Sequence, residues 1–491
     1  MKEPSPLSGA DLDRELSRTL ENLFTSGMAA GLHAPPPAPG PVLILPPDIT
    51  RIHSRAGLLT AAVCRYLDLT RRSNPNTGWR LGAIMPALGT HRPLLPAEIA
   101  LMFPRCPPER FLPHRWREDT VELGRLPADW VEAAFKDGEN SQVPRRRGES
   151  PFYTDWPVQV NRLLRDGLSG PAGAAVPFSL IISIGQVVPH EIAGMANHAK
   201  NIFIGTGGAE AIHKSHWLGA LYGLERLMGR TENPVRSLFD EALRRYGPRL
   251  PPILWVLTVV DYADRVRGLF CGFGRKCFED AAALAAKINI ERIGPAPAAV
   301  REGGAGGFPG VQRAVVWLDP AEYRSTWLGN KAVYRTRRAM ADGGELVILA
   351  PGLDCFGEDP RLDALIRRHG YRGTAAIRQA VEESRGQPGG LAANLSAAAH
   401  LIHGSSENRF TVTYCTPGGA AGGVPLLGRA DIEGAGYRWN SLEEALGRYG
   451  LEDLARVRPG EDVKPAAGWR VTPNGEPYYF IRDPGLGLWT R

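Results

Sequence analysis

The stretch His190–His216 constrains this chain more than any other, because it places reactive side chains between a predicted strand and a predicted helix. Its 27 residues include four of the chain's 11 histidines, two lysines and a Gly-Thr-Gly-Gly turn. The apolar run at 178–188 predicts a buried strand, and the pattern at 209–227 predicts a helix. A polar loop between a strand and a helix is where α/β proteins place their chemistry.

The spacing within this stretch separates possible roles. His213 and His216 are three residues apart on the predicted helix, so both can face one side and bind a metal. His190 ends the predicted strand, and Lys200 lies in the loop, where it can reach a cofactor. Each histidine could instead be a structural residue that hydrogen-bonds or faces solvent. The six cysteines form no CxxC pair, which argues against a cysteine-rich zinc site.

The length of the chain and its Pro/Gly-rich stretches predict two domains. A chain of 491 residues exceeds what one core normally organises. Residues 1–41 read as an N-terminal helix followed by the Pro-rich linker Ala34–Pro41. Strands and helices alternate over 42–293 and again over 311–430, which predicts two α/β domains with mostly parallel sheets. The stretch Gly294–Gly310 between them is a domain boundary or a surface loop.

Two sequence patterns in the second half of the chain predict local structure. A helical pattern over 329–342 is expected to end at Gly343-Gly344, before the buried strand ELVILAP. Residues 431–491 form a C-terminal segment, which could pack back on the first domain. Its Asn474-Gly475 pair, flanked by apolar residues, predicts a hairpin.

The composition narrows the partners and the compartment. A net charge of +6 is small for this length, so we expect anionic small molecules rather than nucleic acid as ligands. The basic run Arg145–Arg147 is expected to be a solvated loop. No apolar run is long enough to cross a bilayer, and the N-terminus lacks a signal-peptide pattern. Unpatterned cysteines agree with a reducing compartment, so a cytoplasmic protein is expected.

Four motifs in order then carry a resemblance to a known family. They are DITR at 48–51, GTHRP at 89–93, the set His190, Lys200 and His216, and Lys331 within STWLGNKAVYRTR. The spacings of ten and sixteen residues in the third set match the signature of the nickel-dependent lactate racemase family. The chain therefore resembles this family over roughly residues 40–420. The resemblance implies two α/β domains with the active site in the cleft between them.

The sequence also departs from the simple lactate racemases. Those enzymes carry a Ser-Gly-Gly-Arg-Lys run before the lysine, whereas this chain has Ala196-Asn197-His198-Ala199-Lys200. A glutamine that they carry three residues before the second-domain lysine is Leu328 here. The residues that make up the motifs are more similar to those of the subgroup labelled aldonate or mannonate epimerases. The resemblance thus favours sugar acids over lactate as substrates.

The resemblance implies a cofactor and a reaction. The family inverts the hydroxyl-bearing carbon of 2-hydroxy acids by hydride transfer to a nickel pincer nucleotide, a pyridinium ring that holds nickel between two sulfur atoms and one carbon. This cofactor is attached to a lysine, which here would be Lys200, and imidazole suits the fourth nickel position, which would fall to His216. Enzymes that synthesise the cofactor are then expected partners. The oligomeric state is left open.

The remaining roles follow from the same resemblance. His91 and His190 match the two histidines that exchange the hydroxyl proton, a task suited to their near-neutral intrinsic pKa. Arg51 and Lys331 are the expected cations for the substrate carboxylate. Asp48 is expected to orient a base or the cofactor. Backbone N–H groups of the Gly-rich turn, at Gly205, Gly207 and Gly208, could bind the nucleotide phosphate at the start of a helix.

Other interpretations remain at this stage. Asp48 and Arg51 could form a local ion pair, Lys331 could be a solvated lysine, and His91 could mark a turn. His198, His400 and His403 have no predicted role beyond structure or substrate contact. The main rival function is a hydro-lyase or hydrolase with a conventional divalent ion on His213 and His216. A cofactor-storage protein without enzymatic activity is a third possibility.

Overall fold

The computed structural model describes residues 4–26, 38–135, 154–170, 173–297, 308–421, 423–456 and 467–491. The chain divides into two compact units, Met1–Tyr222 with Arg226–Asn289, and Gly223–Glu225 with Ile290–Arg491. The run Arg145–Arg147, the first half of the linker Ala34–Pro41 and the centre of Gly294–Gly310 lie outside the described residues.

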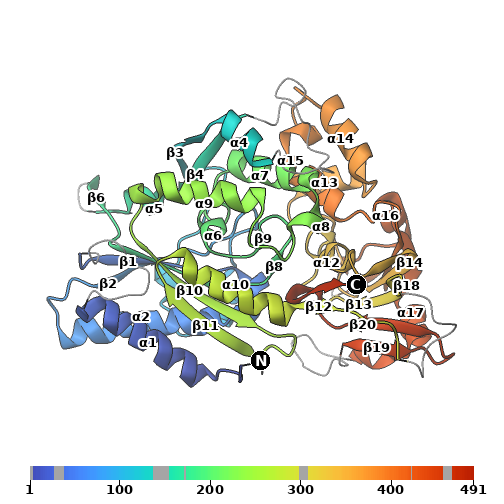
Figure 1. The fold of residues 1–491 in the computed structure, drawn as a ribbon, viewed down its shortest axis with the longest axis horizontal. Helices are drawn as coiled ribbons and strands as arrows, with labels where there is room; N and C mark the ends of the chain where they lie inside the picture. The colour runs from blue at the N-terminus through green and yellow to red at the C-terminus, as the bar shows by residue number, and fades with distance from the viewer. Residues whose placement is uncertain are drawn as a thin grey trace. The chain divides into compact units, whose positions relative to one another are not determined.

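A five-stranded sheet is the frame of the first unit (Figure 1). All neighbouring strands are parallel except the last pair, and their spatial order is β2 (Arg80–Ile84), β1 (Pro41–Leu45), β7 (Leu180–Gln186), β10 (Ile253–Val260) and β11 (Val266–Gly272). Strands β7 and β10 are buried along their full length. Continuous apolar sequences of this kind are typical of parallel strands that are covered on both faces.

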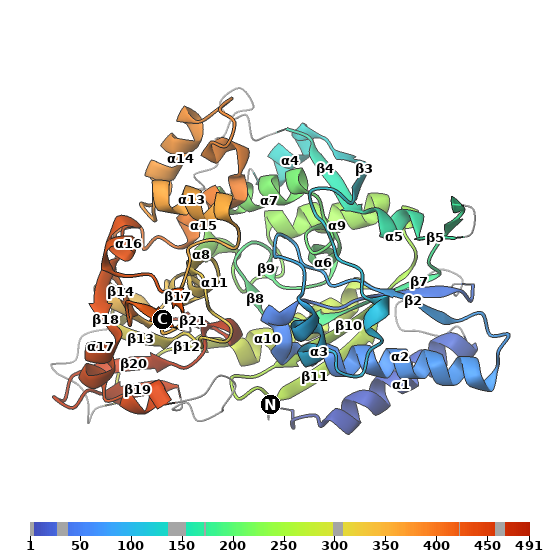
Figure 2. The same cartoon turned by 180° about the vertical axis from the view of Figure 1, so that it is seen from behind.

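Two long helices cover one face of this sheet. Helix α1 (Gly9–Ser26) and helix α2 (Ala56–Ser73) run side by side (Figure 2). The leucines of α1 recur every three or four residues and are all buried in one core with α2 and the sheet, at positions Leu12, Leu16, Leu20 and Leu23. The predicted N-terminal helix is therefore part of the first unit's core.

The other face of the sheet carries α6 (Ala199–Phe203), α9 (Pro234–Tyr246) and α10 (Arg275–Asn289). Side chains alternate along a strand, so Ser183 points away from the α1 side, and its hydroxyl accepts a hydrogen bond of 2.9 Å from Asn201 on α6. The ring of His198 packs between Trp255 of β10 and Phe278 of α10. This second layer carries the loop between β7 and α6.

Shorter elements complete the first unit. They are η1 (Ile49–Ser54), α3 (Pro96–Met102), η2 (Pro108–Arg110), the antiparallel pair β3 (Thr120–Leu126) and β4 (Trp156–Asn161), α4 (Ala128–Phe135), α5 (Arg162–Asp166), the pair β5 (Leu168–Ser169) and β6 (Ala175–Val176), the pair β8 (Pro189–His190) and β9 (Gly194–Met195), α7 (Ala209–Tyr222) and η4 (Gly247–Arg249).

The second unit has a six-stranded sheet, parallel except at one edge. Its spatial order is β18 (Arg438–Ser441), β15 (Thr411–Thr416), β14 (Met340–Leu349), β13 (Val311–Trp317), β20 (Pro477–Ile481) and β19 (Gly468–Val471). Separately, β12 (Ile290–Arg292) pairs with β21 (Leu488–Thr490). The pair β16 (Ala420–Ala421) and β17 (Val424–Pro425) is a small antiparallel ribbon.

The second unit also contains helices and short 3-10 turns. They are α11 (Thr326–Gly329), α12 (Lys331–Thr336), α13 (Pro360–His369), α14 (Thr374–Glu383), α15 (Leu395–His403), α16 (Arg429–Gly434) and α17 (Leu442–Tyr449), with 3-10 turns at η6 (Leu391–Ala393), η7 (Glu452–Arg456) and η8 (Pro484–Leu486). Helix α17 packs its apolar face on β13, β14 and β15 in one core. On the part of the chain that is described, no helix is long and apolar enough to cross a membrane.

The α/β class with mostly parallel sheets in two units is confirmed. The predicted helix over 329–342 was too long, because α12 ends at Thr336 and β14 begins at Met340. Gly343 and Gly344 lie inside β14, where the register with β13 shifts and Gly343 has a φ of 76°. A glycine with positive φ fits a strand bulge as well as a helix end, so the sequence alone did not distinguish the two structures.

Residues 431–491 contribute to the second sheet rather than standing apart as a segment of their own. Strand β18 forms one edge of this sheet, and β20 and β19 lie at the opposite edge. The predicted hairpin at Asn474-Gly475 is present, because β19 and β20 are antiparallel and joined by that turn.

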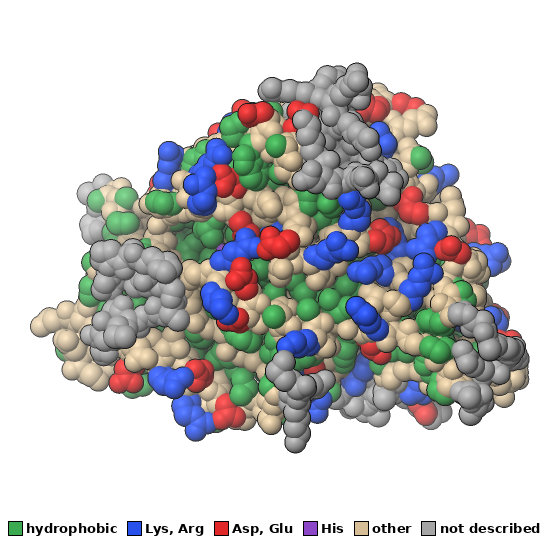
Figure 3. Space-filling view, viewed as in Figure 1, with side chains coloured by type: hydrophobic (Ala, Val, Ile, Leu, Met, Phe, Trp, Pro, Cys, Tyr) green, Lys and Arg blue, Asp and Glu red, His purple; other side chains and the backbone are tan. Residues whose placement is uncertain are grey.

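On the face shown in Figure 3, acidic side chains lie among the basic ones.

Helix α1 provides a stability test of the first unit. Leu16 is fully buried in the core that α1 shares with α2, so Leu16→Ala should lower the free energy of unfolding by about 2–5 kcal/mol. Chemical denaturation followed by circular dichroism measures this change. Arg14→Ala on the same helix is the matched control, because 75% of the Arg14 side chain is exposed and its replacement should change the free energy by less than about 0.5 kcal/mol.

Candidate functional site

Three motifs follow three neighbouring parallel strands of the first unit. DITR comes just after β1, GTHRP follows β2, and His190 follows β7. The carboxyl ends of parallel strands lie at one edge of a sheet, and this edge is where open α/β sheets bind ligands. The candidate site is built at this edge.

Asp48 organises the first of these motifs. It is buried and caps η1, since its carboxylate accepts hydrogen bonds from the backbone N–H of Thr50 at 3.1 Å and from the Thr50 hydroxyl at 2.6 Å. The same carboxylate is hydrogen-bonded to Nδ1 of His91. Burial alone would raise the pKa of the Asp48 carboxyl, but His91, Thr50 and Arg51 oppose it and hold the pKa well below its usual range. Asp48 is therefore ionised.

His91 lies in a turn that is tied to the Gly-rich segment. The N–H of Gly89 donates to the carbonyl of Gly205 at 2.9 Å, and the N–H of His91 donates to the carbonyl of Leu88 at 3.1 Å. Because the Asp48 carboxylate can only accept, Nδ1 of His91 must carry the proton of their hydrogen bond. Nε2 is then the basic nitrogen of His91, as in other carboxylate–histidine pairs.

His190 is buried in the tight turn between β8 and β9. Its Nδ1 accepts hydrogen bonds from the backbone N–H groups of Ile192 at 3.1 Å and Ala193 at 3.4 Å. A carboxylate oxygen of Glu191 lies 3.6 Å from the same nitrogen. The side chain of His190 therefore stabilises the turn that carries it.

Lys200 lies in the first turn of α6, ten residues after His190. Its pKa is lowered to about 8, because burial disfavours the ammonium ion and Arg51 adds positive charge, while Glu191 and Asp48 oppose both effects. These mutual effects mean that DITR and Lys200 occupy one electrostatic environment. A lysine with this pKa is partly a neutral amine at pH 7, which is the nucleophilic form.

His216 on α7 is held in the form that binds metals. Its Nδ1 donates to the carbonyl of Ile212 at 2.7 Å, which leaves the lone pair on Nε2. Burial and the charge of Lys200 lower the pKa of His216 to about 4, so the ring is neutral at pH 7. The link to Lys200 brings the predicted tether and the predicted nickel ligand into the same surroundings.

His213 is one turn away and has different neighbours. Burial, His216 and Arg117 lower the pKa of His213 to about 4, and its ring stands edge-on to Trp116 at 5.8 Å. Within the described ranges, no third His, Cys, Asp or Glu donor lies close enough to His213 and His216 to complete a metal site. This argues against the rival interpretation of a conventional divalent ion on the two histidines.

The Gly-rich turn is built differently from the predicted phosphate cradle. The N–H groups of Gly205, Thr206 and Gly207 already donate to the carbonyls of Lys200, Ile202 and Ile204. Those donors are therefore engaged within the turn in this conformation, and the phosphate role of Gly205 and Gly207 stays a prediction.

Packing explains the glycines of this turn instead. A Cβ at Gly207 would lie 1.9 Å from the carbonyl oxygen of Phe203, and one at Gly208 would lie 2.4 Å from Gln159. His114 supports the turn from outside, because its Nε2 donates to the carbonyl of Gly207 at 3.1 Å. The phosphate role of Gly208 stays a prediction.

Arg236 on α9 is a residue that the sequence analysis missed. It is 1% exposed, and its guanidinium donates to the carbonyls of Asn197 at 3.1 Å, Ala193 at 3.4 Å and Met195. These carbonyls belong to the loop that joins His190 to Lys200. No pattern in the sequence of α9 separates this buried arginine from the other arginines of the helix, so no signal could have found it.

The loop that Arg236 holds has an unusual backbone. Asn197 and His198 have positive φ angles of 72° and 58° in succession, a conformation that is costly for side-chain-bearing residues. His198 is buried between two aromatic rings, and its Nδ1 lies 3.7 Å from Asp240. His198 is thus a structural residue of the loop.

Lys331 belongs to the second unit, at the start of α12. It is 6% exposed, its Nζ lies 3.3 Å from a carboxylate oxygen of Glu322, and it lies 5.1 Å from the centre of the Tyr323 ring. Lys331 is therefore not a solvated lysine. Its predicted role as a substrate ligand, and the predicted position of the active site, stay predictions.

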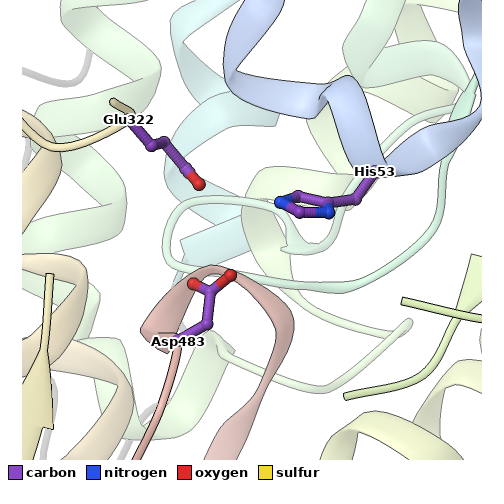
Figure 4. A group of neighbouring side chains, drawn as sticks. All are labelled: His53, Glu322 and Asp483. Atoms are coloured by element: carbon purple, nitrogen blue, oxygen red, sulfur yellow. The ribbon is translucent and has the colours of Figure 1, made fainter. Parts of the chain in front are cut away.

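An acidic pair accompanies Lys331. The hydroxyl of Tyr323 donates to Asp483 at 2.9 Å, and carboxylate oxygens of Asp483 and Glu322 lie within 4.8 Å of each other. The two carboxylates point toward the same space (Figure 4). His53, which Figure 4 also labels, belongs to the first unit, where its Nδ1 lies 3.0 Å from Asp264.

The two histidines of the HLIH sequence are core residues of the second unit. His400 and His403 are both buried on α15. Nε2 of His400 is hydrogen-bonded to the Tyr371 hydroxyl at 3.0 Å, its ring packs on Trp327 at 4.2 Å, and burial lowers its pKa to about 3. These contacts support a structural role for His400.

The fold places this chain in the class of proteins that have two α/β units with mostly parallel sheets. Solved structures share this fold, and two of them show how widely it extends over the chain. A Thermotoga maritima protein solved by a structural genomics consortium is 21% identical, with a TM-score of 0.67 over 90% of this chain and 94% of its own. The lactate racemase apoprotein from Thermoanaerobacterium thermosaccharolyticum is 15% identical, with a TM-score of 0.62 over 99% of this chain and 94% of its own.

The TM-scores establish that the folds are alike, and sequence identities this low show nothing beyond the fold. No protein-family model matches the sequence, and no curated protein matches it. The fold predicted from the family resemblance is therefore the one observed, while the resemblance in activity is a matter for proposal.

The lowered pKa of Lys200 predicts early reaction with amine reagents. The labelling of Lys200 should reach half of its maximum near pH 8, because the neutral amine is the reactive form. Peptide mass spectrometry after short pulses of an acylating reagent across pH 6–11 measures this. A free lysine peptide, which titrates near 10.4, is the reference. A Lys200 profile that coincides with that reference would contradict the prediction.

Proposed function

We propose that this protein is a racemase or C2-epimerase of 2-hydroxy acids that works with a nickel pincer nucleotide attached to Lys200. The observation that carries the proposal is the shared environment of Lys200 and His216, in which the pKa of the lysine is lowered to about 8 and the pKa of the imidazole to about 4. The likeness of fold to a lactate racemase apoprotein supports the same conclusion.

The residues fit this cofactor. Attachment through a lysine amide needs an amine that is neutral near pH 7, and the lowered pKa of Lys200 supplies one. Nickel held by soft donors needs a neutral imidazole nitrogen, and the hydrogen bond from Nδ1 to Ile212 leaves Nε2 of His216 with its lone pair. When bound, the cofactor would take a hydride from the substrate carbon and return it to either face.

The chain's own residues would manage the substrate's proton and charge. The Asp48–His91 pair is suited to take the hydroxyl proton at Nε2 of His91, and His190 would act at the same oxygen. Arg51, the cation beside Asp48 and Lys200, would bind the substrate carboxylate. Lys331 remains the second proposed cation for that carboxylate.

The substrate class is also part of the proposal. We propose that the substrates are sugar acids of the aldonate type, because the residues of the motifs resemble those of the aldonate or mannonate epimerase subgroup. Lactate itself is the alternative. The protein would act in the cytoplasm, and its partners would be the enzymes that make the cofactor.

One experiment tests the function directly. The protein is produced together with cofactor-biosynthesis enzymes and assayed for inversion with each stereoisomer of a panel of aldonates and short 2-hydroxy acids, including lactate. We expect inversion of at least one aldonate, and protein produced without those enzymes should be inactive. Failure of the loaded protein to invert any member of the panel would contradict the proposal.

The attachment site can be tested without any substrate. Lys200→Ala should abolish the covalent adduct, because only a primary amine can form the linkage, and intact-mass measurement of the co-produced protein reads this directly. Lys214→Ala is the control, since Nζ of Lys214 is engaged by Glu210 at 2.6 Å and by the carbonyl of Asp155 at 2.9 Å. An adduct that persists in Lys200→Ala and disappears in Lys214→Ala would move the tether.

The metal ligand has its own measurement. His216→Ala should lose nickel while the organic adduct on Lys200 remains, because the imidazole supplies one of four donors. His213→Ala should keep most of its nickel, since His213 packs edge-on to Trp116. Metal analysis and intact mass of the same samples separate loss of metal from loss of adduct. The opposite pattern of nickel content in the two variants would reassign the ligand.

A further inference from the structure

His91 and His190 have opposite kinds of hydrogen-bond partner at the same ring position. Nδ1 of His91 meets the carboxylate of Asp48, which can only accept. Nδ1 of His190 meets the backbone N–H groups of Ile192 and Ala193, which can only donate. The proton therefore sits on Nδ1 of His91 and on Nε2 of His190.

We propose that the two histidines play different parts, His91 as the general base and His190 as a fixed hydrogen-bond donor that keeps its proton. This inference rests on the proposed function and deepens it. In the simplest two-histidine scheme both rings would alternate as acid and base. Here only Nε2 of His91 has the lone pair that accepting the hydroxyl proton requires.

The turn around His190 makes the alternative costly. To take a proton at Nε2, a neutral His190 must carry its own proton on Nδ1, where it would face the N–H groups of Ile192 and Ala193. Two hydrogen bonds would be lost in a turn where His190 is 5% exposed, and a buried donor left without a partner destabilises the structure.

Glu191 is the charged group that acts in the opposite direction. Its carboxylate oxygen, 3.6 Å from Nδ1 of His190, would favour a proton there. That separation is beyond a hydrogen bond, whereas the Ile192 nitrogen is at 3.1 Å. The nearer backbone donors therefore decide which nitrogen of His190 carries the proton.

The proton balance of the reaction follows. The hydroxyl proton would move to Nε2 of His91, and the proposed cofactor would supply the acceptor for the C2 hydrogen and its electron pair. The same proton returns to the oxygen when the hydride returns. Asp48 stays ionised and stabilises the protonated ring of His91, while the N–H of His190 supports the negative charge that develops on the oxygen.

The protonation pattern can be measured in the protein as purified. Nitrogen-15 NMR of histidine-labelled protein at pH 7 distinguishes protonated from unprotonated ring nitrogens, and single His91 and His190 variants assign the signals among 11 histidines. We expect His190 to show a protonated Nε2 and an unprotonated Nδ1, and His91 to show the reverse. A protonated Nδ1 on His190, in a neutral or a doubly protonated ring, would overturn the inference.

Variants test the consequence for turnover. Glutamine can present an N–H near the position of Nε2 but cannot exchange a proton, so His190→Gln should turn over at least about tenfold faster than His190→Leu. His91→Gln should lose about 10²-fold or more, as expected when a general base is removed. Equal losses in His190→Gln and His190→Leu, in well-folded proteins, would show that His190 transfers protons and would sink the proposal.

A third variant controls for the fold. His190→Asn keeps a side-chain oxygen that can accept from Ile192 and Ala193, but its amide is too short to replace Nε2, so it should melt like the wild type and turn over like His190→Leu. If the wild-type protein inverts no 2-hydroxy acid, the proposed function fails, and the NMR measurement still decides the protonation of His190.

Discussion

The buried guanidinium of Arg236 is the interaction on which the candidate site depends. It draws the carbonyls of Ala193, Met195 and Asn197 together, and its own charge is compensated by Asp240 and by the ring of Phe278, 4.5 Å away. Removal of one partner from such a buried charged arrangement typically costs about 3–5 kcal/mol. The loop between His190 and Lys200 is thus fixed by α9.

This fixed loop explains how two strained residues persist beside each other. Asn197 and His198 both have positive φ, and each such residue costs on the order of 1–3 kcal/mol unless its surroundings determine it. Arg236 holds the carbonyl of Asn197, and the rings of Trp255 and Phe278 enclose His198. The strain places Lys200 at the start of α6, so packing on the far side of the loop decides where the amine lies.

The sequence predicted what depends on periodicity and on motif spacing. The apolar run at 178–188 located β7 within about two residues at each end, and the two α/β units followed from the alternation of strands and helices. Of the candidate site, the effect of Arg51 on the pKa of Lys200 and the effect of Lys200 on the pKa of His216 agree with grouping these motifs. Their catalytic roles remain predictions.

The features that the sequence did not predict depend on contacts between residues that are distant in the chain. Arg236 lies 36 residues after Lys200, and nothing local distinguishes it from the exposed Arg244 on the same helix. The Gly-rich turn suggested a phosphate cradle because glycine spacing is the same for a cradle and for close packing, and only the partners of its N–H groups separate the two. The same limit applied to Gly343-Gly344, where a strand bulge and a helix end share one signal.

The protonation states of the site follow from burial more than from ion pairing. Burial is the largest influence on the pKa of Lys200 and of His216, and it drives both groups toward their neutral forms. Asp48 is the opposite case, because hydrogen bonds and nearby positive groups outweigh its burial and keep it charged. One environment thus holds a partly neutral amine, a neutral imidazole and a carboxylate that is hydrogen-bonded to its histidine. Solvent entering the site would reverse the first two and weaken the third, so the packing that excludes water is part of the chemistry.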